Sequence, residues 1–324
     1  MALLEVEHLT ISLATAQGRV PVVRDASFAL PPGGTLGIVG ESGSGKSLTA
    51  LALMGLLPER AEVFGSIGFD GQELTSLGDN AMRKLRGADI AMVFQEPMTG
   101  LNPLHRIGVQ IAEPLRLHHG LGRAQAQERA IALMQRVGLS DPARRAQSYP
   151  HEFSGGQRQR AMIAMALACG PKLLIADEPT TALDATTQAH ILDLIRDLVG
   201  EIGMALLLIS HDLAVIAQNV THVLVLYAGQ IVESGAVADV LARPAHPYTR
   251  GLMAARPGLT KAGMRLQTIE GVAPKPGQMP PGCSFAPRCG FAIQQCGAVR
   301  PALDSMGGGH AVRCIRPEAR SPVA

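Results

Sequence analysis

Residues 40–47, which read GESGSGKS, constrain the fold of this chain more than any other segment. They fit the pattern G-x-x-x-x-G-K-[ST], which forms a phosphate-binding loop when it joins a buried strand to a helix. The apolar run 36–39 precedes the loop and a helix-favouring run begins at Leu48, so both parts of that context are present. The sequence therefore predicts an α/β domain of the P-loop type that binds a nucleotide.

Each residue type in this loop has a physical role. Glycines let the backbone turn so that successive N–H groups converge on phosphate oxygens, and the N-terminal end of the next helix favours the same anion. Lys46 can reach the β- and γ-phosphates, and Ser47 can offer its hydroxyl oxygen to Mg²⁺. The predicted nucleotide-binding residues of the loop are Gly40, Ser42, Gly43, Ser44, Gly45, Lys46 and Ser47.

Composition and hydropathy limit the class of protein. The net charge is +2 and no tract is rich in lysine or arginine, so nothing indicates a surface for nucleic acid. The most apolar stretch, 161–176, is interrupted by Gly170, Pro171 and Lys172, and falls short of the roughly 20 apolar residues that span a bilayer. Residues 1–10 lack the basic flank and apolar core of a secretory signal. We therefore expect a cytosolic protein that can dock onto a membrane-embedded partner.

The order of predicted elements indicates an α/β domain with two additions. Strands that alternate with helices predict a largely parallel sheet. We expect short strands within 3–30 and over 66–69, 90–94, 173–176, 205–209, 223–227 and 230–233, and helices over 48–57, 106–117, 124–137, 153–168 and 185–199. The helices between about 96 and 160 form a predicted helical insertion. Glycine and proline increase after about Arg243, so we place a domain boundary between residues 242 and 243, with 243–324 as a C-terminal region.

Two carboxylates follow the buried run 173–176. Asp177 stands where a second Mg²⁺-organising carboxylate belongs in a P-loop ATPase, and Glu178 is placed to polarise the attacking water. An Asp-Glu pair alone is more often a solvated strand end. The phosphate loop upstream favours the catalytic interpretation.

A second backbone anion site is predicted at the start of a later helix, in Phe153-Ser154-Gly155-Gly156-Gln157. With it, the chain resembles the ATP-binding subunits of ABC transporters. Their phosphate loop, glutamine loop, signature, Walker B strand, D-loop and histidine switch match, in this order, residues 40–47, Gln95, 153–157, 173–178, 182–184 and His211.

This resemblance implies an ABC ATPase core with a mostly parallel sheet flanked by helices, an N-terminal antiparallel β subdomain and a helical insertion. It implies a head-to-tail dimer, in which the signature residues Ser154, Gly155, Gly156 and Gln157 of one subunit close over ATP in the other. It assigns Glu178, His211 and Gln95 to catalysis and Asp184 to the D-loop. Mg²⁺ is assigned to Ser47, Gln95 and Asp177.

Three further segments resemble the narrower family of dipeptide and oligopeptide importers. They are 95–103, which has Glu96 and Gly100 where that family has aspartate and serine, 246–249 (HPYT) and 282–289 (GCSFAPRC). The family offers an aromatic ring to adenine near the N-terminus, where this chain has Leu13. We therefore expect aliphatic contacts to the base and only a modest preference for ATP over GTP.

The resemblance also implies partners and a location. It predicts two membrane-spanning permease subunits, a second ABC ATPase subunit, for which a paralogue is favoured over a second copy of this chain, and an extracytoplasmic solute-binding protein, with no nucleic acid. The chain would be peripheral, on the cytoplasmic face of the inner membrane. An importer for nickel or another small solute shares nearly all the motifs and stays open. A non-transport ABC ATPase, such as a DNA-repair or translation factor, is disfavoured because those chains carry long coiled coils or two ATPase cores.

Four of the five cysteines are close together in the sequence, spaced C-x5-C-x6-C-x17-C at Cys283, Cys289, Cys296 and Cys314. Four thiolates suit a [4Fe–4S] cluster or structural zinc. The spacing is wider than that of ordinary zinc sites, which favours the cluster, and some peptide-importer ATPases, which the chain resembles, carry one here. Zinc and unliganded thiols remain alternatives. We expect this Gly- and Pro-rich stretch to have little core of its own.

Overall fold

The computed structural model describes residues 2–16, 18–95, 100–181, 183–255 and 268–317. By their internal contacts these residues divide into two compact units. The first unit contains Met1–Leu3, Leu30–Gly34 and Ser76–Ile209, and the second contains Leu4–Ala29, Thr35–Thr75 and Ser210–Ala324, as far as each is described. The domain boundary expected between residues 242 and 243 does not coincide with this division and stays a prediction.

Three parallel strands form the sheet of the first unit: β6 (Ile90–Val93), β7 (Leu173–Asp177) and β8 (Ala205–Ser210). Every residue of β7 and β8 is buried, which explains their almost continuous apolar sequences, since parallel strands are covered on both faces. Because parallel strands end at the same edge, the segments after β6 and β7 emerge beside each other.

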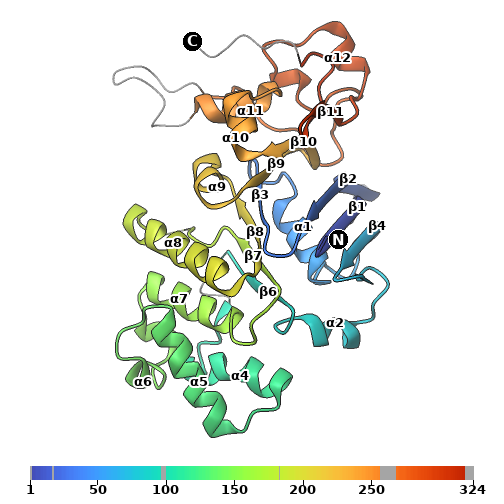
Figure 1. The fold of residues 1–324 in the computed structure, drawn as a ribbon. Helices are drawn as coiled ribbons and strands as arrows, with labels where there is room; N and C mark the ends of the chain where they lie inside the picture. Colours follow the sequence, from blue (N-terminus) through green and yellow to red (C-terminus); the bar gives the residue numbers. More distant parts are fainter. Residues whose placement is uncertain (1, 17, 96–99, 182, 256–267, 318–324) are drawn as a thin grey trace. The chain divides into compact units, whose positions relative to one another are not determined.

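The helices of the first unit include the predicted insertion, coloured green in Figure 1. The predictions for α4 (Ile107–His119) and α5 (Arg123–Arg136) are correct within two residues, and both helices pack on α7 (Gly155–Ala166). The remaining elements are α2 (Asp79–Leu85), α6 (Pro142–Arg145), the 3₁₀ turn η1 (Pro150–Glu152) and α8 (Ala185–Ile202). Residues 96–99, part of the predicted glutamine-loop segment, lie outside the described residues.

An antiparallel sheet begins the second unit, in the order β2 (Gly18–Leu30), β1 (Leu4–Thr15), β4 (Glu62–Phe69) and β5 (Gln72–Glu73). The expectation of short strands in 3–30 was wrong, because β1 and β2 are 12 and 13 residues long. In β1 a register shift between Glu7 and Thr10, with His8 at φ 51°, moves the buried side chains out of strict alternation. This bulge makes one long strand resemble two short ones in sequence.

The second unit also contains strands on both sides of the predicted C-terminal boundary. Strand β3 (Thr35–Val39) pairs in parallel with β9 (His222–Tyr227), and antiparallel pairing continues through β10 (Gln230–Ala236), β12 (His310–Val312) and β11 (Asp304–Gly307). The Gly- and Pro-rich C-terminal stretch packs on this sheet, because β12 pairs with β10 and the ring of Phe285 is buried against Tyr248.

The helices of the second unit begin with α1 (Lys46–Leu53), which follows the phosphate loop. It was predicted over 48–57, with Pro58 as its end, but Gly55 at φ 60° ends it earlier. The others are α9 (Leu213–Asn219), α10 (Val237–Ala242), α11 (Pro247–Ala254), the 3₁₀ turn η2 (Ala286–Arg288) and α12 (Gln294–Ala298). Within the residues that the structure describes, no helix combines the length and apolar character needed to cross a membrane.

Candidate nucleotide site

The phosphate loop connects β3 to α1, as the sequence predicts. Gly45 is the N-cap residue of α1 and has φ 101°, a conformation that glycine adopts readily and other residues rarely do. No side-chain hydrogen bond caps this helix. A Cβ on Gly40 would lie 2.1 Å from the carbonyl oxygen of Leu226. Glycine is thus required at two positions of the loop for two different reasons, one conformational and one steric.

Lys46 begins α1 and is only 5% exposed. Its ammonium Nζ donates hydrogen bonds to the carbonyl oxygens of Gly40 (2.8 Å) and Glu41 (3.0 Å), which closes the loop around the lysine. Ser47 is half-buried in the first turn of α1. The loop therefore presents a cation and the N-terminal end of a helix, the combination that binds phosphate groups.

Other loop residues differ in exposure. Ser42 and Gly43 are exposed, whereas Ser44 is buried and its carbonyl accepts a hydrogen bond from the N–H of Gly229 (3.0 Å). Leu13, predicted to contact adenine, is a half-buried residue of β1. The nucleotide-binding roles of these residues stay predictions.

The carboxylates of the first unit lie at the end of β7. Asp177, its last residue, is 4% exposed. Glu178 has φ 46°, an uncommon value for a residue other than glycine, and its carboxylate Oε2 accepts hydrogen bonds from Thr181 Oγ1 (3.0 Å) and Gln95 Nε2 (3.3 Å). The structure thus brings together Gln95 and Glu178, two of the three residues predicted to be catalytic.

His211 is the third of them. It follows β8 directly and is exposed, while the next residue, Asp212, caps α9 by accepting a hydrogen bond from the N–H of Ala214. Its predicted role in sensing the γ-phosphate stays a prediction.

The signature serine caps α7. Ser154 Oγ accepts a hydrogen bond from the N–H of Gln157 (3.3 Å), and the Gln157 side chain accepts one from the N–H of Ser154 (3.1 Å). This reciprocal capping box fixes the start of the helix. The predicted anion site is therefore a well-defined helix N-terminus.

The glycines of the signature lie against the D-loop and α8. A Cβ on Gly156 would lie 2.7 Å from Thr187 Cγ2, and one on Gly155 would lie 3.3 Å from Leu183 Cδ2. Asp184 caps α8 and accepts hydrogen bonds from the N–H and hydroxyl of Thr187, which hold the pKa of its carboxyl below the usual value. Ala182, the first D-loop residue, lies outside the described residues.

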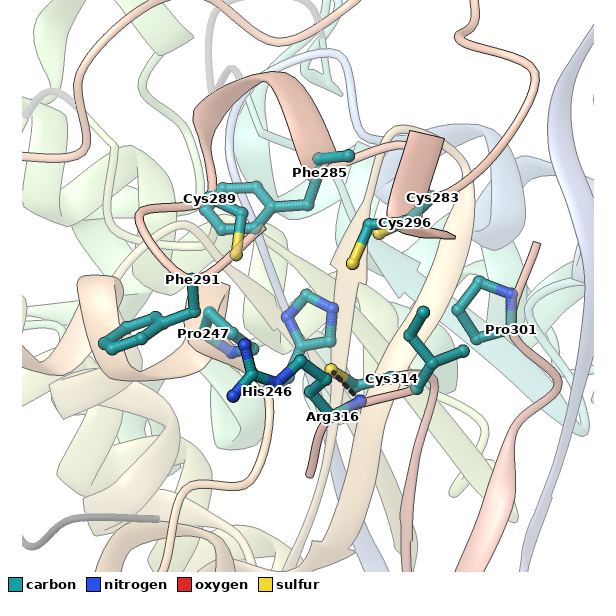
Figure 2. A pocket seen from close by; sticks show the side chains of 12 residues that line it. His246, Pro247, Cys283, Phe285, Cys289, Phe291, Cys296, Pro301, Cys314 and Arg316 are labelled. Carbon is teal, nitrogen blue, oxygen red and sulfur yellow. Dashed lines mark hydrogen bonds between the residues drawn. The ribbon is translucent and has the colours of Figure 1, made fainter. Parts of the chain in front are cut away.

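All four C-terminal cysteines line one pocket together with His246 and Phe285 (Figure 2). We call it the thiol pocket. Burial raises the pKa of three of the thiols, those of Cys283, Cys289 and Cys314. Across the described residues, however, no three His, Cys, Asp or Glu side chains form a group that could hold a metal ion. The cysteines are gathered as the sequence predicts, but not in the arrangement of a metal site.

The sequence did not predict a set of contacts to the phosphate loop. Tyr248 and Arg288 both bond to Glu41 of the loop. They belong to segments 246–249 and 282–289, which stood out only because they resemble an importer family. Spacing in the sequence could not have found these contacts, since the partners are 207 and 247 residues apart.

A phosphate loop ahead of a helix, with a buried parallel strand ending in Asp-Glu, defines a P-loop ATPase. Comparison with known families is more specific. The family described as ABC transporter matches residues 23–181, and the family described as oligopeptide/dipeptide transporter, C-terminal region, matches residues 232–296.

Similar proteins cover nearly the whole chain. A Brucella abortus (strain 2308) protein, BAB2_0817, named as a candidate peptide import ATP-binding protein, is 50% identical over 327 residues, which cover 97% of each chain. A similarly named Brucella suis protein is 50% identical over 313 residues, covering 96% of this chain and 94% of the other. The chain belongs to the family of ABC transporter ATP-binding proteins that carry the oligopeptide/dipeptide transporter C-terminal region, and it is an ATPase.

Solved structures share the fold of the cassette. A dimeric ATP-binding cassette, MJ0796, bound to ADP and Pi, matches with a TM-score of 0.65 and 26% identity over 72% of this chain and 98% of that one. The cbiO1 protein of Clostridium perfringens matches with a TM-score of 0.62 and 24% identity over 74% of this chain and 91% of that one. The predicted ABC ATPase fold is thereby confirmed.

Proposed function

We propose that this chain is the ATP-hydrolysing subunit of an ABC importer and couples ATP binding and hydrolysis to uptake of dipeptides or oligopeptides. One observation carries the proposal: relatives named for peptide import are 50% identical to the chain over 97% of its length, C-terminal region included. The alternatives of nickel or another small solute as substrate have no comparable support.

The ATP site would use groups from the phosphate loop and from the end of β7. Lys46 and the loop N–H groups would bind the β- and γ-phosphates. Ser47, Gln95 and Asp177 would hold Mg²⁺, and their hydroxyl, amide and carboxylate oxygens are the hard donors that this ion prefers. When bound, Mg²⁺ neutralises charge on the phosphoryl group that is transferred.

Glu178 would act on the attacking water. The hydrogen bonds from Gln95 and Thr181 hold its carboxylate in one orientation, which supports this role. His211 would contact the γ-phosphate. Asp184 would act in the D-loop, where its capping bonds to Thr187 make it rigid.

Two subunits would complete each site. Ser154, Gly155, Gly156 and Gln157 would close over ATP held by the phosphate loop of the second ATPase subunit, a paralogue. The capped N-terminus of α7 supports this role, because it presents backbone N–H groups to an anion. ATP would then hold the dimer closed until it is hydrolysed.

The work of the dimer would appear in other proteins. Two permease subunits would carry the peptide across the inner membrane, with this chain peripheral on its cytoplasmic face, and an extracytoplasmic solute-binding protein would deliver the peptide. The similarity to candidate peptide import proteins supports these partners.

We also propose that the thiol pocket takes up a [4Fe–4S] cluster, with zinc or no metal as the alternatives. The shared pocket of Cys283, Cys289, Cys296 and Cys314 supports this. Protein purified without oxygen should contain about four iron atoms per chain and absorb visible light. Colourless protein with one zinc atom, or with no metal, contradicts the cluster.

The function is tested in proteoliposomes that contain the permease, both ATPase subunits and the solute-binding protein. We expect ATP-dependent uptake of a labelled oligopeptide, and with Glu178→Gln a loss of ATP hydrolysis of about 10²- to 10⁴-fold while ATP still binds. Glu128→Gln, which changes an exposed glutamate of α5, is the matched control. Near-normal hydrolysis by Glu178→Gln would contradict the catalytic role proposed for Glu178. Uptake of nickel but not of peptide would contradict the proposal that the substrate is a peptide.

A further inference from the structure

Glu41, the second residue of the phosphate loop, is bonded through three of its groups. Its N–H donates to the hydroxyl of Tyr248 (2.9 Å), its carbonyl accepts from Lys46 Nζ (3.0 Å), and its carboxylate accepts from Arg288 Nη1 (2.8 and 3.1 Å). One residue therefore links the phosphate-binding lysine to two residues of the C-terminal region.

Arg288 is held firmly. Its side chain is 6% exposed, against 30% for Glu41. Nη1 also donates to the hydroxyl of Tyr227 (3.3 Å), while Nε and Nη2 donate to the carbonyls of Glu270 (2.9 Å) and Ile269 (3.2 Å). A guanidinium bonded in three directions has few alternative positions, and an ion pair with little exposure is weakly screened by solvent. A shift of the Arg288 backbone would therefore be passed to Glu41.

Tyr248 is fixed by packing. Its ring lies 4.6 Å from that of Tyr227 and 5.5 Å from that of Phe285, between ring centroids, and both tyrosines are fully buried. Closely packed aromatic rings have little room to move. The hydroxyl of Tyr248 thus holds the N–H of Glu41 at a set position.

Both residues adjoin the thiol pocket. Arg288 immediately precedes Cys289, and Tyr248 immediately follows Pro247, and both Cys289 and Pro247 line the pocket (Figure 2). Phe285, which packs on Tyr248, lines it too. A rearrangement of the pocket would move the backbone that carries the two contacts to Glu41.

We propose that Arg288 and Tyr248 are positioning residues for ATP hydrolysis: they hold Glu41, and through it the phosphate loop, and make the ATP site depend on the state of the thiol pocket. The proposal deepens the proposed function and rests on it. Both residues contact Glu41 of the phosphate loop, so their effect passes through the loop.

The positioning role is tested by ATPase kinetics of the whole transporter with Arg288→Gln, Glu41→Gln and the double variant. Each single change should raise the KM for ATP about tenfold. The double variant should be no worse than either single, because both remove the same link. Arg288→Lys, which keeps the charge but not the planar fork, should recover part of the loss. Arg300→Gln is the control, since this C-terminal arginine is exposed and its Nε donates to the carbonyl of Pro281, away from Glu41.

Wild-type KM and kcat in folded Arg288→Gln overturn the proposal, as do additive effects in the double variant. If Arg288→Gln does not fold, Tyr248→Phe decides, because it removes only the hydroxyl and keeps the ring: a raised KM supports the proposal and an unchanged KM overturns it. ATP hydrolysis by the wild type, and its loss in Glu178→Gln, test the proposed function independently of these results.

The dependence on the thiol pocket is tested with a reversible mercurial reagent on metal-free protein, in a Cys169→Ser background that leaves only the four pocket thiols. The reagent should change the KM for ATP when Arg288 and Tyr248 are both present, and should have little effect in a variant that carries Arg288→Gln and Tyr248→Phe together, because that variant lacks both contacts to Glu41. An equal change in both proteins, or no change in either, overturns this part of the proposal.

Discussion

The amide Nε2 of Gln95 lies 3.3 Å from the carboxylate Oε2 of Glu178 and donates a hydrogen bond to it. Gln95 follows β6 and Glu178 follows β7, so the parallel pairing of these strands sets the contact. Glu178 also has φ 46°, a backbone conformation that is strained for a residue other than glycine. Contacts with neighbouring residues are therefore needed to hold it in this orientation.

Gln95→Ala should lower kcat about tenfold and raise the KM for MgATP about threefold. The kcat falls because the substitution removes a hydrogen bond to the proposed catalytic carboxylate, and the KM rises because it also removes a proposed Mg²⁺ ligand while the phosphate loop stays intact. Steady-state ATPase assays of the assembled transporter check this, with Gln125→Ala, an exposed residue of α5, as the control. An unchanged kcat would show that the contact has no part in the reaction.

Gly40→Ala should weaken ATP binding by at least about tenfold. A Cβ at this position would lie 2.1 Å from the carbonyl oxygen of Leu226 and 2.9 Å from Ser44 Oγ, so the loop would have to move. Titration with a fluorescent ATP analogue measures the change. Gly200→Ala is the control, because its Cβ meets nothing within 4 Å, and alanine there should stabilise α8 slightly.

Much of the site could be predicted because its motifs are local. The phosphate loop, the signature and the Asp-Glu pair each lie within eight residues, and their backbone turns depend on residues inside the segment. The end of α1 differs from the prediction for a local reason too: Gly55, with φ 60°, ends the helix before Pro58 is reached. A glycine just after the last helical residues is a common stop signal, so this end is also encoded locally.

The C-terminal region could not be predicted in the same way. Strands β11 and β12 are four and three residues long, too short for a periodic pattern, and they form because β10 offers a partner at Glu233 and Ser234. The Arg288–Glu41 pair joins residues 247 apart. Such contacts depend on the tertiary fold, which spacing along the chain does not encode.

Glu73→Gln should destabilise the antiparallel sheet by about 1 kcal/mol at neutral pH. Partial burial raises the pKa of Glu73, but hydrogen bonds from Ser66, Thr75 and the N–H of Ile67 outweigh it and lower the pKa to about 2. In the unfolded chain the carboxyl of Glu73 has the ordinary glutamate pKa of about 4.3. The stabilisation is therefore complete above about pH 4.3 and is lost as the pH falls toward 2.

Urea unfolding of wild type and Glu73→Gln across this pH range measures the effect. The difference in unfolding free energy should shrink as the pH falls. Glu5→Gln, at an exposed position of β1, should show no such difference. A gap that stays constant down to pH 2 would contradict the lowered pKa.

Ser154 has two roles in this account, and substitutions can separate them. As the cap of α7 its Oγ accepts a hydrogen bond from the N–H of Gln157, and as a signature residue its hydroxyl would face the γ-phosphate in the other subunit. Aspartate caps helices as well as serine does, whereas alanine costs about 1 kcal/mol. The free energy of unfolding of Ser154→Asp should therefore lie within a few tenths of a kcal/mol of the wild-type value, and that of Ser154→Ala should be about 1 kcal/mol lower.

Activity should follow the opposite order. The carboxylate of Ser154→Asp repels the γ-phosphate, so ATPase activity of the assembled transporter should fall at least about tenfold below that of Ser154→Ala, although the aspartate variant is the more stable protein. Urea unfolding and ATPase assays of the same preparations compare the two orders. If activity simply follows stability, Ser154 serves only as a helix cap. That outcome would contradict its proposed contact with the ATP held by the other subunit.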